Sequence, residues 1–89
     1  MMWKPTRNSN IKTNILPDGY VLVQLSQSDW VYVLTPLAGI AWEFCDGENT
    51  LEDIIRNVVQ IHPAQKKDDL AKEIASLLEE FRNADLVAA

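Results

Sequence analysis

The sequence has one cysteine, Cys45, and one histidine, His62. A single cysteine excludes an internal disulfide, so nothing points to an oxidising compartment, and one cysteine with one histidine lacks the ligand spacing of a zinc site. No hydrophobic run approaches the roughly 20 residues of a membrane helix, and the polar start MMWKPTRNSN lacks the hydrophobic core of a signal peptide. We therefore expect a cytoplasmic protein with no membrane partner and no metal or other cofactor.

Positive charge is absent from the middle of the chain. From Thr13 to Ile55 there is no Lys or Arg, and the net charge of the 89 residues is −5. A nucleic-acid surface needs basic side chains placed to meet phosphates, so this pattern argues against nucleic acid as a partner. Phosphate-binding loops, dinucleotide fingerprints and hydrolase elbows are missing as well. We expect no enzymatic activity from this chain.

The residues that are present predict one small domain, with 47% hydrophobic residues. We expect a flexible tail over residues 1–10 and a single domain over residues 11–89. Three segments rich in β-branched and aromatic residues predict strands at Ile11–Leu16, Tyr20–Leu25 and Trp30–Leu34.

The spacing of hydrophobic residues becomes helical after the third strand. Thr35 followed by Pro36 predicts a helix start, and one hydrophobic face of this helix is formed by Leu37, Ile40, Ala41, Phe44 and Cys45. Gly47 is expected to end the helix with a positive φ. Cys45 is interpreted as an inert buried thiol and Trp42 as a core aromatic residue.

Two further helices follow. Thr50 and Asp53 predict a capped start for the second, which Pro63 ends, and its inner face comprises Leu51, Ile54, Ile55, Val58, Val59 and His62. The third runs from about residue 65 to 84, with an inner stripe of Leu70, Ile74, Leu77, Leu78 and Phe81. Leu86 and Val87 are expected to fold back on the core. The order β-β-β-α-α-α predicts a winged-helix-like α+β fold with a three-stranded antiparallel sheet.

The stretch VYVLTPLAGIAWEFCDGENTLEDI resembles the signature of the PqqD-like family, also called RiPP recognition elements. The matching features are a strand ending in Leu34, a capped helix with Gly39 and the pair Ala41-Trp42, then Asp46-Gly47. The segment from Thr50 to Ile54 and the closing helix LAKEIASLLEEFRNADLV continue the match. In one respect the chain departs from members devoted to pyrroloquinoline quinone synthesis. They carry an LLAPE-like stretch where this chain has QLSQSDWVY, which favours another peptide product.

The resemblance implies a non-catalytic adaptor that binds the leader segment of a ribosomally made precursor peptide. The leader would add as a strand beside the third strand, next to the third helix, and be presented to a modifying enzyme such as a radical SAM enzyme or a leader peptidase/cyclase. Carried over to this sequence, these elements are Trp30–Leu34 and Leu70–Leu77, which gives as expected peptide-binding residues Trp30, Val31, Tyr32, Val33, Leu34, Leu70, Lys72, Glu73, Ile74 and Leu77. We add Lys66 and Lys67, because with Lys72 they lie near the start of the same helix. The three lysines could steer an acidic leader.

Strand patterning independently favours an exposed edge. VYVL and YVLV are hydrophobic on both faces, although three helices and three short strands make only two layers. An exposed hydrophobic edge strand is a hazard unless something pairs with it, and an extended peptide can do so. Another copy of the chain could pair there too, so a weak homodimer stays open. Trp30 and Tyr32 fit core filling and groove lining equally well. The alternative function is a winged-helix DNA-binding regulator, which the charge pattern disfavours.

Overall fold

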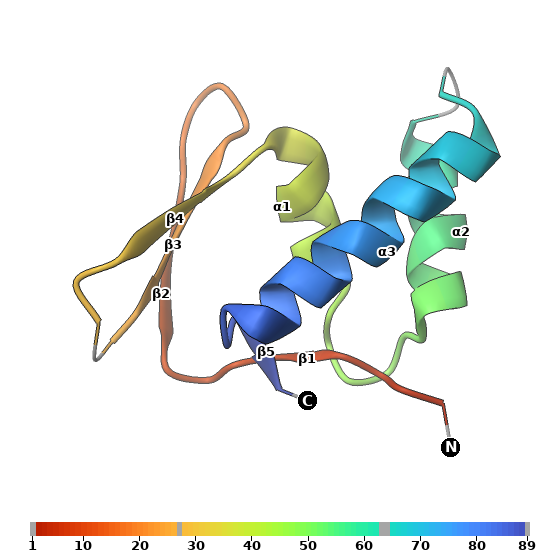
Figure 1. Ribbon diagram of the computed structural model, residues 1–89. Coiled ribbons are helices and arrows are strands. Elements are labelled where there is room, and N and C mark those ends of the chain that lie inside the picture. The colour runs from red at the N-terminus through yellow and green to blue at the C-terminus, as the bar shows by residue number, and fades with distance from the viewer. Residues whose placement is uncertain (1, 27, 63–64, 89) are drawn as a thin grey trace.

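The computed structural model describes residues 2–26, 28–62 and 65–88. The elements are β1 (Thr6–Arg7), β2 (Ile11–Ile15), β3 (Val21–Leu25), β4 (Val31–Leu34), α1 (Pro36–Glu43), α2 (Leu51–Ile61), α3 (Lys67–Asn83) and β5 (Val87–Ala88). Figure 1 shows the sheet of β2, β3 and β4 beside the three helices, with both termini at the same end of the molecule. The predicted α+β fold of three antiparallel strands and three helices is confirmed.

The three-stranded sheet has β3 in the centre and β2 and β4 at its edges. Val21 pairs with Leu34, and Val23 pairs with Tyr32. Val21, Val23 and Leu34 are buried, so this face packs on the helices. Side chains alternate along a strand. Val31 and Val33 therefore point to the opposite face of the sheet, where both are exposed.

Helix α1 packs its small residues against the sheet. The Thr35 hydroxyl accepts a hydrogen bond from the Ala38 N–H, and Pro36 occupies the first turn, as predicted. A Cβ on Gly39 would lie 2.7 Å from Val21 Cγ2, so only glycine allows this approach. The buried residues are Ala38, Gly39, Ala41, Trp42 and Cys45. The expected face is thus only partly correct, because Leu37, Ile40 and Phe44 are half-buried.

Helices α2 and α3 complete the core. Thr50 and Asp53 form the predicted capping box, and Ile54 and Val58 are fully buried. The inner stripe of α3 is confirmed by the burial of Leu70, Ile74, Leu78 and Phe81. α2 ends at Ile61, and Pro63, expected to end it, lies outside the described residues.

The N-terminal segment differs from the expected flexible tail. Residues Thr6 and Arg7 form β1, which pairs antiparallel with β5, and Pro5 is fully buried. The Arg7 guanidinium lies 5.4 Å from the centroid of the Trp42 ring and donates to the backbone oxygen of Glu43. These contacts join residues far apart in sequence, so local composition gave no sign of them. The predicted return of Leu86 and Val87 to the core is confirmed.

The segment between α1 and α2 is a turn stabilised by Asp46. Its carboxylate accepts hydrogen bonds from the backbone N–H groups of Glu48 and Asn49. The first of these bonds is the main reason that the pKa of Asp46 lies below its ordinary value. Gly47 has the predicted positive φ of 83°. However, α1 already ends at Glu43, so the expectation that Gly47 ends the helix is wrong.

Gly47→Ala should lower the free energy of unfolding by about 1–2 kcal/mol, because a side chain is disfavoured at this φ. The new Cβ would also lie 2.8 Å from Thr6 Oγ1. Urea denaturation of the variant measures the loss. In a Thr6→Ala background the steric part should disappear and the conformational part remain. An unchanged denaturation midpoint would contradict the account of this turn.

Candidate functional site

Two hydrogen bonds at the ends of β2 and β3 show which residues of these strands bond to each other through their backbone groups. Ser26 N–H donates to Asn10 O at 2.9 Å, and Leu16 N–H donates to Tyr20 O at 2.8 Å. These pairs continue the register of the two strands. Backbone groups alternate between the two sides of a strand. The even-numbered residues of β3 therefore bond to β2, and the odd-numbered ones bond to β4.

This alternation defines which backbone N–H and C=O groups of β4 have no partner inside the sheet. Tyr32 and Leu34 lie opposite odd-numbered residues of β3 and use their backbone groups inside the sheet. The N–H and C=O groups of Val31 and Val33 consequently point to the open edge. Val31 and Val33 are 48% and 61% exposed. β4 thus offers unpaired backbone donors and acceptors together with hydrophobic side chains.

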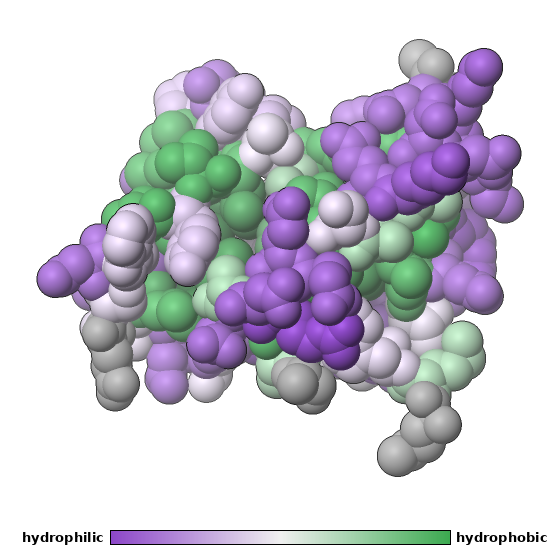
Figure 2. Space-filling view, viewed as in Figure 1, coloured by the Kyte–Doolittle hydropathy of each residue, from purple (hydrophilic) through white to green (hydrophobic). Residues whose placement is uncertain are grey.

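A groove of about 300 Å³ lies directly beside this edge. Its lining comes from β4 and α1 on one side and from α3 and the C-terminal segment on the other, and comprises Tyr32, Val33, Leu34, Thr35, Ala38, Leu77, Glu80, Phe81, Ala84 and Leu86. Figure 2 shows hydrophobic residues gathered in the region where β4 lies in Figure 1, while the upper ends of α2 and α3 are hydrophilic. The groove volume lies near the lower limit of small-ligand sites, about 300–1,000 Å³, so it suits a few side chains of a longer partner.

The other edge of the sheet, β2, is a weaker candidate. Its odd-numbered residues also direct their backbone groups outward. Yet β2 carries Lys12, a charge that protects edge strands from pairing, whereas β4 has no charged residue. The residues around Lys12 line a smaller pocket of about 210 Å³ on the outer face of the sheet. β4 is therefore the stronger candidate of the two edge strands, because the larger groove between the sheet and α3 lies beside it.

The structure divides the predicted site residues into two groups. Tyr32, Val33, Leu34 and Leu77 meet in the groove, and Val31 lies along the same edge. Trp30 is 76% exposed just before β4, so it is not a core residue. Tyr32 is half-buried and lines the groove.

The remaining predicted residues lie on the N-terminal half of α3 or just before it. Leu70 and Ile74 are fully buried, so they offer no surface to a ligand in this conformation. Lys66, Lys67, Lys72 and Glu73 are exposed there, outside the lining of the groove. The groove meets the C-terminal half of the helix instead.

Sequence reasoning missed six groove residues, which are Thr35, Ala38, Glu80, Phe81, Ala84 and Leu86. One signal was available for α3, because Leu77, Glu80 and Ala84 follow a spacing of three and four and share one side of a helix. This side adjoins the buried stripe. Its contact with β4 depends on how the helix crosses the sheet, which periodicity does not give.

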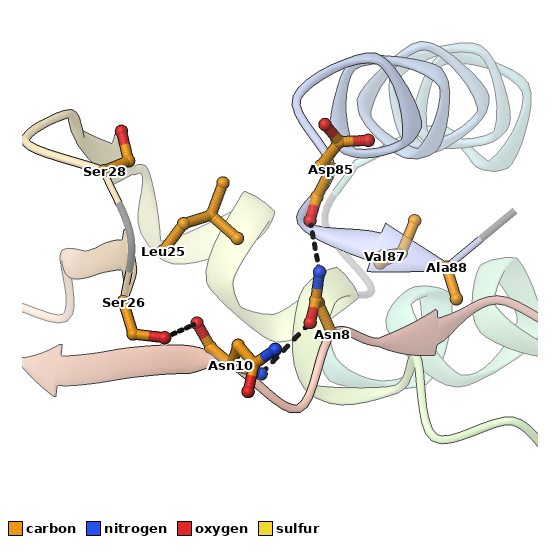
Figure 3. Close-up of a pocket in the computed structure, with 8 residues that line it drawn as sticks. All are labelled: Asn8, Asn10, Leu25, Ser26, Ser28, Asp85, Val87 and Ala88. Carbon is orange, nitrogen blue, oxygen red and sulfur yellow. Dashed lines mark hydrogen bonds between the residues drawn. The ribbon is translucent and has the colours of Figure 1, made fainter.

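A second pocket, of about 390 Å³, lies between the end of β3 and the two terminal segments of the chain. Figure 3 shows its lining of Asn8, Asn10, Leu25, Ser26, Ser28, Asp85, Val87 and Ala88. The Asn8 side chain donates to Asp85 O at 3.2 Å, which ties the C-terminal segment to the N-terminal one. Successive residues 84–87 alternate between the two pockets. The hydrophobic groove and the polar pocket thus share the C-terminal segment as a wall.

The described residues give no support for a metal site or a membrane-spanning helix. No group of three or more metal-ligating side chains occurs in the described ranges. None of the helices described combines the length and hydrophobicity needed to cross a membrane.

Cys45 is fully buried, and its burial raises the pKa of the thiol from 9.0 to about 12. It should therefore react slowly with a thiol reagent in the native protein and quickly in denaturant. Because the unfolded thiol ionises first as pH rises, the free energy of unfolding should fall above about pH 9. Thiol labelling with and without urea, and urea melts between pH 7 and 10, measure both effects. Equal labelling rates in both states would contradict the burial.

The fold and the site together define a small α+β domain with an open strand edge beside a hydrophobic groove. The family model of coenzyme PQQ synthesis protein D (PqqD) matches residues 19–87 of the chain. The chain belongs to this family, which confirms the resemblance seen in the sequence.

A comparison with the curated proteins finds no match. Among solved structures, TbiB1 in complex with the TbiA(beta) leader peptide is similar to this chain, with a TM-score of 0.77 and 12% sequence identity. The similarity covers 94% of this chain and 95% of TbiB1. At this identity the likeness establishes the shared fold.

Proposed function

We propose that this protein is a non-catalytic adaptor that binds the leader segment of a ribosomally made precursor peptide. The observation that carries the proposal is the free edge of β4. Val31 and Val33 direct unpaired backbone groups outward, next to a groove with hydrophobic side chains on both walls. An extended peptide satisfies both features at once, through main-chain hydrogen bonds and side-chain contacts.

Two comparisons support a peptide as the ligand. The chain belongs to the PqqD family, and the similar TbiB1 structure contains a leader peptide. In this chain the leader would lie beside β4 as a fourth strand of the sheet. Alternate leader side chains would enter the groove between β4 and α3, because strand side chains alternate in direction.

We further propose that the protein presents the bound precursor to an enzyme. A leader held along β4 leaves the rest of the precursor free to reach a second protein, such as a radical SAM enzyme or a leader peptidase/cyclase. The adaptor then raises the local concentration of the substrate at that enzyme. Within this proposal the chain supplies binding and orientation, and its partner supplies the chemistry.

Titration of isotope-labelled protein with candidate precursor leaders tests the proposal. The largest amide shifts should fall on Val31–Leu34 and on the Leu77–Ala84 part of α3. Shifts confined to α2, together with binding to generic duplex DNA at low salt, would instead support the winged-helix regulator. A complete lack of shifts with any leader would contradict peptide binding.

A further inference from the structure

The groove beside β4 has one charged residue in its lining, Glu80. The other lining residues are uncharged, and β4 and α1 lie in the part of the sequence that has no Lys or Arg. The groove therefore presents negative charge to a peptide that lies along β4.

The nearby cations do not neutralise Glu80. Its neighbour Glu79 is paired with Arg82 at 2.6 Å, and the Arg82 guanidinium lies 4.6 Å from the centroid of the Trp3 ring. Among the residues that the structure describes, Glu80 has no ion-pair partner. A cation supplied by a ligand could take that place.

The lysines of α3 are too far away to change this. Lys67 precedes Glu80 by thirteen residues, which is about 20 Å along a helix at 1.5 Å per residue. Lys72 precedes it by eight residues, or about 12 Å. Exposed charges are screened beyond about 10 Å at 0.1 M salt. The expected steering of an acidic leader by these lysines thus acts at the wrong end of the helix for this groove.

We infer that the groove selects leader segments in which a lysine or arginine accompanies the hydrophobic residues, with Glu80 as the partner of that basic side chain. The inference rests on the proposed peptide-binding function and adds the chemistry of the peptide. Hydrophobic side chains of the leader would contact the half-buried Tyr32 and Leu77 on the two walls. The basic side chain would lie on the α3 wall, where its charged end stays in contact with water.

Selection from a phage-displayed library of random dodecapeptides tests this inference. The wild-type protein should enrich hydrophobic sequences that contain Lys or Arg. The variant Glu80→Lys should lose that preference and enrich Asp or Glu instead. Glu48→Lys makes the same change of charge in the exposed turn before α2, and this control should behave like wild type.

A synthetic peptide from the selection then measures the size of the effect. Replacing its basic residue by glutamine should weaken binding to the wild type about two- to five-fold, as for an exposed ion pair. The same replacement should leave binding to Glu80→Gln unchanged. Enrichment of acidic peptides by the wild type, or equal preferences of wild type and Glu80→Lys, would overturn the inference but leave peptide binding intact. Enrichment of no sequence by any of these proteins would overturn both.

Discussion

Val33→Pro is expected to weaken leader binding by about tenfold or more while leaving the domain folded. Proline removes the N–H that points to the open edge of β4, and edge strands tolerate proline at such positions. The leader carbonyl then loses its donor, a loss worth about 1–3 kcal/mol, and about 1.4 kcal/mol is tenfold in Kd. Calorimetry with a leader peptide measures the affinity, and circular dichroism checks the fold.

Two controls separate this effect from others. Val33→Thr keeps the backbone N–H and a β-branched side chain, so it should bind almost as well as wild type. Thr13→Pro removes the outward N–H of the other edge strand, β2, and should leave binding unchanged. If Thr13→Pro abolished binding and Val33→Pro did not, the leader would pair with β2 and the proposed site would be wrong.

Ile74→Ala and Leu77→Ala should separate stability from binding on one helix. Ile74 is fully buried, so its truncation should lower the free energy of unfolding by about 2–5 kcal/mol, the range for large core side chains. Leu77 is half-buried and lines the groove. Its truncation should cost less stability and reduce leader affinity, because it removes hydrophobic contact area from the binding wall.

Urea denaturation and calorimetry on both variants measure the two effects. The folded fraction of Ile74→Ala should bind with nearly the wild-type affinity, because that side chain does not reach the groove. A folded Ile74→Ala protein that lost binding, alongside a Leu77→Ala protein that kept it, would place the leader on the N-terminal half of α3. The segment Leu70–Leu77, which the family resemblance implies, would then describe the site better than the C-terminal half does.

Much of the fold could be predicted because its signals are local. The β-branched segments of β3 and β4, the caps at Thr35 and Thr50, and the buried stripe of α3 each depend on residues close together in sequence. The predicted face of α1 was less accurate. Periodicity favours the large residues such as Leu37, whereas the packed interface uses Gly39, whose approach to β3 has no local signal.

The candidate site was predictable only in part, for the same reason. The apolar pattern of β4 indicated that one face or edge would be left over, and its position as an edge strand is seen in the sheet. The side of α3 that faces the edge depends on the crossing of helix and sheet. This crossing brings Leu77 and Glu80 to the groove and leaves Leu70 in the core.

The sequence by itself determined the three strands of the main sheet, the helices, the family resemblance and the absence of positive charge from the middle of the chain. These properties follow from residue type and short-range spacing, which a single chain displays directly. The tertiary structure decided that Val31 and Val33 direct their backbone groups outward, that the N-terminal segment pairs with β5, and that a carboxylate lies in the groove. Each of these depends on contacts between residues far apart in sequence, and only the packed chain brings those residues together.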